Sequence, residues 1–485
     1  MKSKNRILGL SAAMLSLLTS CGIGGNRPNY IEYQGPDFSL VNFDESTNVT
    51  IKFAHSMGTK LKTMTEKYIE VFKEQYPNVK VELQSNGNYS DLLSNVSKEI
   101  PADNAPTMAF CYPDHVATYD QGFLGSNVLQ LSNGNGKALL DLEDKSFLKS
   151  FVSEFVEEGQ KYDQAGTTFS MPWAKSTEVM FYNADVFTAL GITPPKYWFN
   201  PDNKYDLNSV EGVCYKLKAE YPTSHPLGYD SEDNMFITLC KQFGIKYTEL
   251  TDEGPALYFR NTNTELKTLM EKLKEMYDAG LFITKGLSES GSYTSTLFCD
   301  QECFMTIGST GGTSYNIPSS ESKKGVFNVK AANMPQQGLL DSKKYGFGQI
   351  LQGPSICLFN TPNNTPVQLR AAWEFYKVSM DAKLSVDYSI QSGYEPVRTT
   401  CFDEGSEAYL YREAELKKID SIYTEVKETS LKAKEDGYFF VTDVFVGSAT
   451  ARSQCGGALC NYLTGSKTFD QAFNDAINNT VIDML

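Results

Sequence analysis

The segment "VTIKF" at residues 49–53 opens the part of the chain that decides the fold. Its apolar side chains alternate, so Val49, Ile51 and Phe53 share one face, as in a strand that is buried on one side. The pattern continues with a helix around 61–72, a strand at 79–83, a helix around 91–100 and a strand within 106–112. This order of strands and helices is typical of a parallel sheet with helices on its faces.

A second α/β region is predicted to begin near residue 168. Residues 169–183 have an extended pattern, and residues 265–279 have the periodicity of an amphipathic helix, which Gly280 ends. A strand pattern returns within 348–359. Capping signals then predict the starts of two more helices, at Thr365 with Pro366 and at Thr468 with Gln471.

The N-terminus has the features of a bacterial secretory signal. Basic residues precede an apolar run at 7–18, and small residues then lead to Cys21, as in a lipoprotein processing site. We predict a signal peptide over 1–20 and a diacylglycerol on the sulfur of Cys21, because two acyl chains give a stable membrane anchor. Residues 21–47 are predicted to be the lipidated cysteine and a flexible tether on the extracellular face of the membrane.

The composition is typical of a globular protein, with 41% hydrophobic and 12% aromatic residues. The formal charge of −15 argues against a nucleic-acid partner, which requires a basic surface. Ten cysteines include Cys21, and the nine others cannot all pair within one chain. We expect buried thiols with one or two disulfides. The three histidines are scattered, so neither a metal site nor a cofactor is predicted.

Motifs of covalent catalysis are missing from the sequence. There is no Gly-x-Ser-x-Gly elbow. The segment "GNGK" at 134–137 does not complete a P-loop motif, because Leu131 stands where the first glycine is needed. Ser320 and Lys323 have the spacing of a Ser-x-x-Lys motif without its companions. Carboxylate pairs for glycoside hydrolysis stay open, because their spacing in space is not visible in the sequence. The missing motifs alone are mild evidence against an enzyme. We predict a protein that is not an enzyme, with a surface-anchored hydrolase as the alternative.

The segment "QSGYEPVR" at 391–398 places Tyr394 between a flexible glycine and a stiff proline, which alone indicates a surface turn. It belongs, however, to a series of landmarks: "FAHSMG" at 53–58, "GNYSDLL" at 87–93, "KSTEVMFYN" at 175–183, "CFMTIGSTGG" at 303–312, "GYEPVR" at 393–398 and "GSKTFDQAF" at 465–473. In these motifs the chain resembles family 1 extracellular solute-binding proteins of ABC importers. Within that family it is most similar to the glycerol-3-phosphate-binding branch.

The resemblance implies a two-lobed α/β fold, in which each lobe is a mostly parallel sheet flanked by helices and crossing hinge strands join the lobes. By this likeness, lobe one holds 48–163 and 350–395, and lobe two holds 164–349 and 396–485. The implied function is capture of a small polar solute outside the cell and its delivery to ABC permease subunits. We expect a monomer. An oligosaccharide-binding lipoprotein of the same class is the nearest alternative.

The resemblance also implies which residues bind the solute. Arg452 matches an arginine that grips phosphate through its planar fork of donors. Asp114 stands one position from a glutamate of the branch. The full set implied by the family is Tyr89, Asp114, Ser176, Ser309, Gly353, Tyr394 and Arg452.

The sequence departs from the branch at two places that bear on the ligand. Ala54 and the acidic segment "YDSEDN" at 229–234 stand where the branch has tryptophans, and carboxylates near a phosphate lower affinity. A phosphodiester with a cationic head group, or a neutral sugar or polyol, therefore stays open beside glycerol-3-phosphate. Trp173 is considered as a stacking platform for a sugar, or else as a core residue. Arg398 is expected in an ion pair at the hinge or rim.

Overall fold

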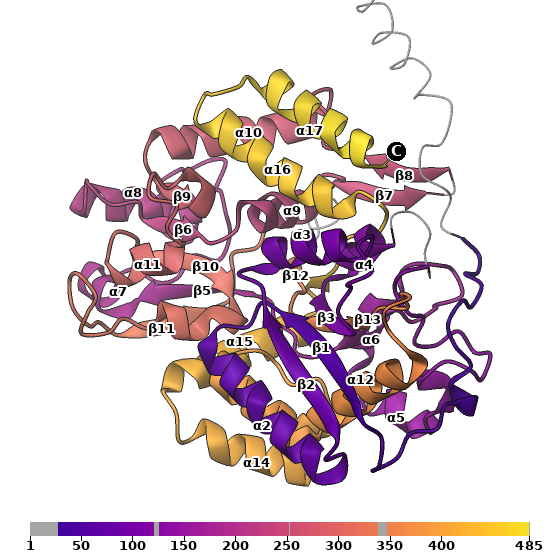
Figure 1. The fold of residues 1–485 in the computed structure, drawn as a ribbon. Helices are drawn as coiled ribbons and strands as arrows, with labels where there is room; N and C mark the ends of the chain where they lie inside the picture. The colour runs from indigo at the N-terminus through magenta and orange to yellow at the C-terminus, as the bar shows by residue number, and fades with distance from the viewer. Residues whose placement is uncertain (1–27, 121–125, 252, 338–346, 485) are drawn as a thin grey trace, which may run out of the picture.

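The computed structural model describes residues 28–120, 126–251, 253–337 and 347–484 of the 485-residue chain. The predicted signal peptide and Cys21 lie outside these residues. The described chain forms two five-stranded sheets with helices around them, which confirms the predicted α/β class (Figure 1).

The first sheet has the strand order β2-β1-β3-β13-β4. Strand β1 (Val49–His55) is parallel to β2 (Val79–Ser85) and to β3 (Met108–Cys111). Strand β13 (Ser355–Leu358) is antiparallel both to β3 and to β4 (Met171–Pro172). Strand β13 therefore runs against the other four, which share one direction.

The second sheet has the order β11-β5-β10-β6-β9, with strands Val329–Ala332, Glu178–Asn183, Met305–Ser309, Leu227–Tyr229 and Phe282–Thr284 respectively. Strand β5 is antiparallel to both of its neighbours, whereas β10, β6 and β9 are parallel to one another. One strand is thus reversed here too, and both sheets are mostly parallel.

Helices cover the two sheets and separate two hydrophobic cores. The first core joins β1, β2, β3 and β13 to helices such as α2 and α12, and the second joins β5, β6 and β10 to α9, α10, α16 and α17. In Figure 1 the yellow helices α16 and α17 lie side by side, and α16 also contacts α10 and α4. We call the first sheet with its helices the first half, and the second sheet with its helices the second half. The helices are α2 Thr59–Gln75, α3 Tyr89–Glu99, α4 Pro113–Tyr119, α5 Lys145–Lys149, α6 Ser153–Glu157, α7 Ala184–Leu190, α8 Val210–Glu220, α9 Glu232–Gln242, α10 Thr264–Asp278, α11 Thr294–Cys299, α12 Pro366–Ser379, α13 Ala382–Ser392, α14 Glu407–Leu416, α15 Ser421–Glu435, α16 Ser448–Leu463 and α17 Phe469–Met484.

Local sequence signals set several helix ends as predicted. Thr365 caps α12 and exchanges hydrogen bonds with Gln368, and Thr468 forms the same reciprocal contact with Gln471 before α17. Gly280, with a φ of 66°, follows the end of α10 in the left-handed conformation that glycine adopts without strain.

Two expectations differ from the structure. Residues 28–47, expected to belong to a flexible tether, pack on the first core: Ile31 and Phe38 are buried, and the Ile31 N–H donates to Asp163 at 3.0 Å. Apolar side chains in this segment favour burial over an extended spacer. The expected disulfides are also absent from the described residues, where all nine cysteines are free thiols and seven are buried.

The chain crosses between the two sheets along segments that hydrogen-bond to one another. Ser176, between β4 and β5, exchanges backbone hydrogen bonds of 2.8 and 2.7 Å with Gln352, between β12 (Gln349–Ile350) and β13. Lys175 exchanges two more with Glu395, which follows α13. The first crossing, at 173–177, is thus hydrogen-bonded to the second crossing at Gln352 and to the third crossing at Glu395. Which residues form which lobe stays a prediction, although β4 lies in the first sheet.

The side chain of Lys175 fixes this crossing from within. It is fully buried, and its Nζ donates to the buried Glu158 carboxylate, to the Gly353 carbonyl at 3.2 Å and to Ser355 Oγ at 3.0 Å. A buried ammonium needs such a complete set of partners, because its desolvation is costly. One side chain therefore links the first crossing, the second crossing and the segment after α6.

Removing this ammonium should destabilise the protein strongly. In Lys175→Met the Glu158 carboxylate is left buried without its partner, and we expect the free energy of unfolding, measured by chemical denaturation, to fall by about 3–5 kcal/mol. Adding Glu158→Leu should restore much of the loss, since no unpaired charge remains. Lys216→Met breaks an exposed pair with Glu220 and is the control, with a change under about 0.5 kcal/mol. Equal effects of Lys175→Met and Lys216→Met would contradict this account.

Candidate functional site

Two tyrosines meet where two helices begin beside the first sheet. Tyr89 is the first residue of α3, whose start is fixed by a capping box between Asn88 and Asp91. Tyr112 precedes α4 at the end of β3. The two rings stack with centroids 4.5 Å apart and an interplanar angle of 29°. Both residues are half-buried.

Tyr394 reaches the same place from the third crossing. Gly393, at φ 88°, lets the chain turn there, since a Cβ on it would lie 2.2 Å from the Thr310 carbonyl. The Tyr394 ring packs against Gly311, and its hydroxyl is hydrogen-bonded to Tyr89. Burial raises the pKa of Tyr394 to about 12, so the phenol stays neutral.

The backbone of Tyr394 is held from behind. Its carbonyl accepts hydrogen bonds from Ser389 Oγ at 2.6 Å and from Lys427 Nζ at 2.9 Å, and Lys427 also donates to Ser389 at 2.7 Å. Lys427 is buried, and this burial lowers its pKa to about 8. A tyrosine anchored in this way has little freedom to reorient.

Arg452 approaches the tyrosines from the second half. It lies in α16, half-buried, and its Nη2 donates to Asn234 Oδ1 in α9. Burial by itself lowers the pKa of Arg452, but the Asp114 and Asp233 carboxylates more than offset this effect, and the pKa is raised. Tyr112 also interacts with this guanidinium. Arg452 therefore connects groups carried by both sheets.

The carboxylates outnumber the cation at this point. Asp114 is in the first turn of α4, and Asp233 is in the first turn of α9. Burial raises the pKa of Asp233 to about 6, although Arg452 opposes the rise. We call Tyr89, Tyr112, Tyr394, Asp114, Asp233 and Arg452 the tyrosine–arginine cluster. With both aspartates ionised, its side chains carry a formal charge of −1.

The structure brings together four of the expected residues: Tyr89, Asp114, Tyr394 and Arg452. Ser309 is adjacent, because its Oγ accepts the Gly311 N–H at 3.1 Å beside the Tyr394 ring.

Ser176 and Gly353 lie in the crossing segments instead. Gly353 has a φ of 102°, and a Cβ on it would lie 2.4 Å from the Ala174 carbonyl. The close approach that requires glycine there is therefore to the crossing chain.

Sequence reasoning missed four residues of this region: Tyr112, Asp233, Asn234 and Tyr247. Two of them, Asp233 and Asn234, lie in the acidic segment noted at 229–234, which was a usable signal. Tyr112 directly precedes the Pro113–Asp114 pair. Tyr247 gave no sequence signal, because its contact with the Arg452 environment depends on how α9 and α16 pack.

Two other expectations are settled by packing. Trp173 is buried in the first core, with the Phe53 and Phe110 rings each 5.4 Å away, so it is not a platform for a sugar. Arg398 lies over the Phe151 ring at 4.5 Å, a cation–π contact, and the expected ion pair is not among its described contacts.

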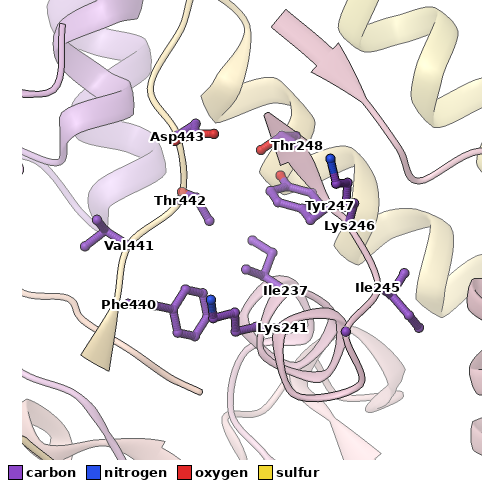
Figure 2. Close-up of a pocket in the computed structure, with 11 residues that line it drawn as sticks. Ile237, Lys241, Ile245, Lys246, Tyr247, Thr248, Phe440, Val441, Thr442 and Asp443 are labelled. Atoms are coloured by element: carbon purple, nitrogen blue, oxygen red, sulfur yellow. The ribbon is translucent and has the colours of Figure 1, made fainter. Parts of the chain in front are cut away.

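A pocket of about 370 Å³ adjoins the cluster at Tyr247 (Figure 2). Its walls come from the end of α9, from residues 244–248 and from residues 440–443, which lead from β14 (Phe439–Phe440) toward α16. Lys241 lies 5.8 Å from the centre of the Phe440 ring. Tyr247 both lines the pocket and interacts with Arg452, so the pocket is next to the Arg452 end of the cluster.

Neither a metal site nor a membrane span is found in the part of the chain that the structure describes. No three His, Cys, Asp or Glu side chains are grouped there to hold a metal ion. None of its helices has both the length and the apolar character needed to cross a bilayer.

The packing of Gly311 against Tyr394 gives a test of the cluster's geometry. A Cβ on Gly311 would lie 2.5 Å from the Tyr394 ring, whereas one on Gly312 would have its nearest neighbour at 3.9 Å. Gly311→Ala should displace the ring and lower the free energy of unfolding by about 1–3 kcal/mol, with an altered near-ultraviolet circular dichroism of the tyrosines. Gly312→Ala, the matched control, should change stability by less than about 0.5 kcal/mol. Identical behaviour of the two variants would show that the ring is not packed there.

Comparisons with known proteins identify the family to which the chain belongs. Residues 67–413 match the family model described as bacterial extracellular solute-binding protein. The sn-glycerol-3-phosphate-binding periplasmic protein of Pectobacterium atrosepticum is 22% identical over 370 residues, which cover 76% of this chain and 77% of the relative. Its counterpart in Escherichia coli strain K12 is 23% identical over 374 residues, covering 75% and 77%.

Solved structures share the fold at low sequence identity. UgpB from Mycobacterium tuberculosis in complex with glycerophosphocholine has a TM-score of 0.67 and 14% identity, covering 90% of this chain and 98% of its own. An ABC substrate-binding protein from Listeria monocytogenes in complex with cycloalternan has a TM-score of 0.68 and 16% identity, covering 90% and 99%. The predicted family and branch resemblance are confirmed. The chain belongs to the bacterial extracellular solute-binding proteins, and it is a binding protein rather than an enzyme.

Proposed function

We propose that this protein is the solute-capturing component of an ABC importer and that it holds its solute at the tyrosine–arginine cluster, between the two sheets. Tyr89, Tyr112 and Asp114 come from the first half and Arg452 from the second, so a bound molecule would contact both. Solute-binding proteins close around ligands by hinge motion, which the three crossing segments would allow. The captured solute would then pass to the permease subunits.

One observation carries the choice of ligand: the Arg452 guanidinium interacts with two carboxylates, Asp114 and Asp233, and with Tyr112, whose ring stacks on Tyr89. A phosphate monoester with two negative charges would be repelled by Asp114 and Asp233. A phosphodiester carries one negative charge for Arg452, and a cationic head group would match the carboxylates. Tyrosine faces also attract quaternary ammonium groups. We therefore favour a zwitterionic glycerophosphodiester, such as glycerophosphocholine, over glycerol-3-phosphate.

An oligosaccharide is the second candidate. The pocket at Tyr247 leaves room beside the cluster, with aromatic and hydroxyl groups in its wall. The Listeria neighbour was solved with cycloalternan, a carbohydrate. Trp173 would have no part in such binding, because it is buried in the core.

The two candidates make different predictions for Arg452, which titration calorimetry can compare with glycerol-3-phosphate, glycerophosphocholine and maltooligosaccharides. We expect wild type to bind glycerophosphocholine most tightly. Arg452→Ala should weaken that binding by about 2–5 kcal/mol, because the phosphodiester loses its buried charged partner. Arg452→Lys should restore part of it, since an ammonium cannot reproduce the fork. Asp114→Asn should weaken glycerophosphocholine but not glycerol-3-phosphate.

Three outcomes of these titrations would contradict the proposal. If an oligosaccharide binds best and Arg452→Ala costs only about 1 kcal/mol, one ordinary hydrogen bond, the second candidate is correct. If glycerophosphocholine binds Arg452→Ala as tightly as wild type, the proposed phosphate contact is wrong. If the ligand is recovered in a chemically altered form, the protein acts as a hydrolase.

We also propose that the protein is anchored through lipid on Cys21, with its binding domain on the extracellular face of the membrane. Support comes from the processing motif before Cys21 and from the family, whose members act outside the cytoplasm. We expect Cys21→Ala to move the protein from the membrane fraction into the medium or the soluble fraction, as measured by fractionation and immunoblotting. A Cys111→Ala variant is the control for loss of a thiol elsewhere. Full membrane retention of Cys21→Ala would contradict the anchor.

A further inference from the structure

A buried carboxylate lies directly behind Arg452. Glu178, at the start of β5, is 1% exposed and accepts hydrogen bonds from Tyr229 Oη at 2.6 Å and from Asn234 Nδ2 at 3.0 Å. The other end of the same amide, Asn234 Oδ1, accepts the hydrogen bond from Arg452 Nη2. Three side chains thus form a chain of hydrogen bonds from the core to the guanidinium of the cluster.

The hydrogen-bonding groups around Glu178 come from β6, α9 and β12, and Ser309 of β10 is its partner in the sheet. Tyr229 is in β6, Asn234 is in α9, and Gln349 of β12 donates to the Glu178 backbone carbonyl. Among charged groups, Arg452 of α16 favours the ionised carboxylate, and Asp230, which follows β6, disfavours it. Asn234 is itself buried, with 6% of its surface exposed, so its amide depends mainly on protein partners.

We propose that Glu178 is a positioning residue that fixes the Asn234 amide and, through it, the Arg452 guanidinium, so that solute binding depends on whether Glu178 carries a proton. This inference rests on the proposed role of the cluster in solute binding. It adds a proton linkage to that role.

The mechanism follows from the donors and acceptors of the amide. An ionised Glu178 only accepts hydrogen bonds, so it holds the Asn234 NH₂ group and leaves Oδ1 directed at Arg452. A protonated Glu178 carries a donor, which favours rotation of the amide so that Oδ1 turns toward the carboxyl group. The NH₂ group would then face the Arg452 donors, and Arg452 would lose its anchor.

The relevant pH range is near neutral. Burial raises the pKa of Glu178 to about 7, although the hydrogen bonds from Tyr229 and Asn234 oppose the rise. Since the folded-state pKa is above the ordinary value, the folded protein binds the extra proton, and stability falls as pH rises through this range. Binding and stability should therefore change in opposite directions with pH, which a purely structural role would not produce.

The experiment compares wild type with Glu178→Gln, which has nearly the same shape and cannot titrate. Titration calorimetry with glycerophosphocholine at about pH 6.5 and about pH 8 should give wild-type Kd values that differ by about three- to four-fold, tighter at the higher pH, because the ionised fraction of Glu178 rises. Glu178→Gln should bind equally at both pH values, within about two-fold, and should lose less stability than wild type between about pH 5 and 8. Both calorimetric pH values lie above the pKa of Asp233, which is about 6, whereas the denaturation range includes it, and there the comparison with Glu178→Gln cancels the contribution of Asp233.

Glu211→Gln is the matched control, because Glu211 is also a buried carboxylate but pairs with Lys272 away from the cluster. It should keep the wild-type pH dependence of Kd. A wild-type Kd that is constant or tighter at the lower pH would overturn the proposal, as would unchanged pH dependence in Glu178→Gln.

If no glycerophosphocholine binding is detected, the proposed ligand has failed, and the strongest binder of the calorimetric panel replaces it. If no panel member binds, the free energy of unfolding is measured by chemical denaturation as a function of pH. Equal pH dependence of this free energy in wild type and Glu178→Gln would overturn the proton linkage.

Discussion

The buried ammonium of Lys175 is the interaction on which the rest of the structure depends. It joins Glu158, the Gly353 carbonyl and Ser355 at the place where the chain passes between two sheets with separate cores. An uncompensated charge there would cost several kcal/mol, so the three partners must all be in place. The geometry of the crossings is therefore strongly constrained, even though each crossing is only a few residues long.

The position of Tyr394 in the tyrosine–arginine cluster depends on this constraint. Glu395, paired with Lys175 through the backbone, directly follows Tyr394, and Lys427 and Ser389 hold the Tyr394 carbonyl from the other side. Arg452 arrives from the second half, held by Asn234 and, behind it, by Glu178. Rigid groups from two separate hydrophobic cores can meet a ligand on both faces, which suits a protein that captures a solute and later releases it.

Local features of this fold were predictable from the sequence, whereas its long-range pairings were not. Strand β1 follows from alternation, and the starts of α12 and α17 follow from capping residues that act within four positions. The antiparallel insertion of β13 beside β3 depends on residues more than 200 positions apart, for which alternation carries no information. Family resemblance located Tyr394 and Arg452, but Glu178 and Tyr247 became visible only when β5, α9 and α16 were packed together.

The central claim is that solute binds between the two sheets and draws them together. Small-angle scattering of the purified domain, with and without saturating glycerophosphocholine, tests this claim most directly. The account predicts a smaller radius of gyration with ligand for wild type, and a smaller decrease for Arg452→Ala at the same ligand concentration, because the phosphodiester then lacks its charged contact from the second half. An unchanged radius in wild type at proven saturation would contradict binding between the sheets.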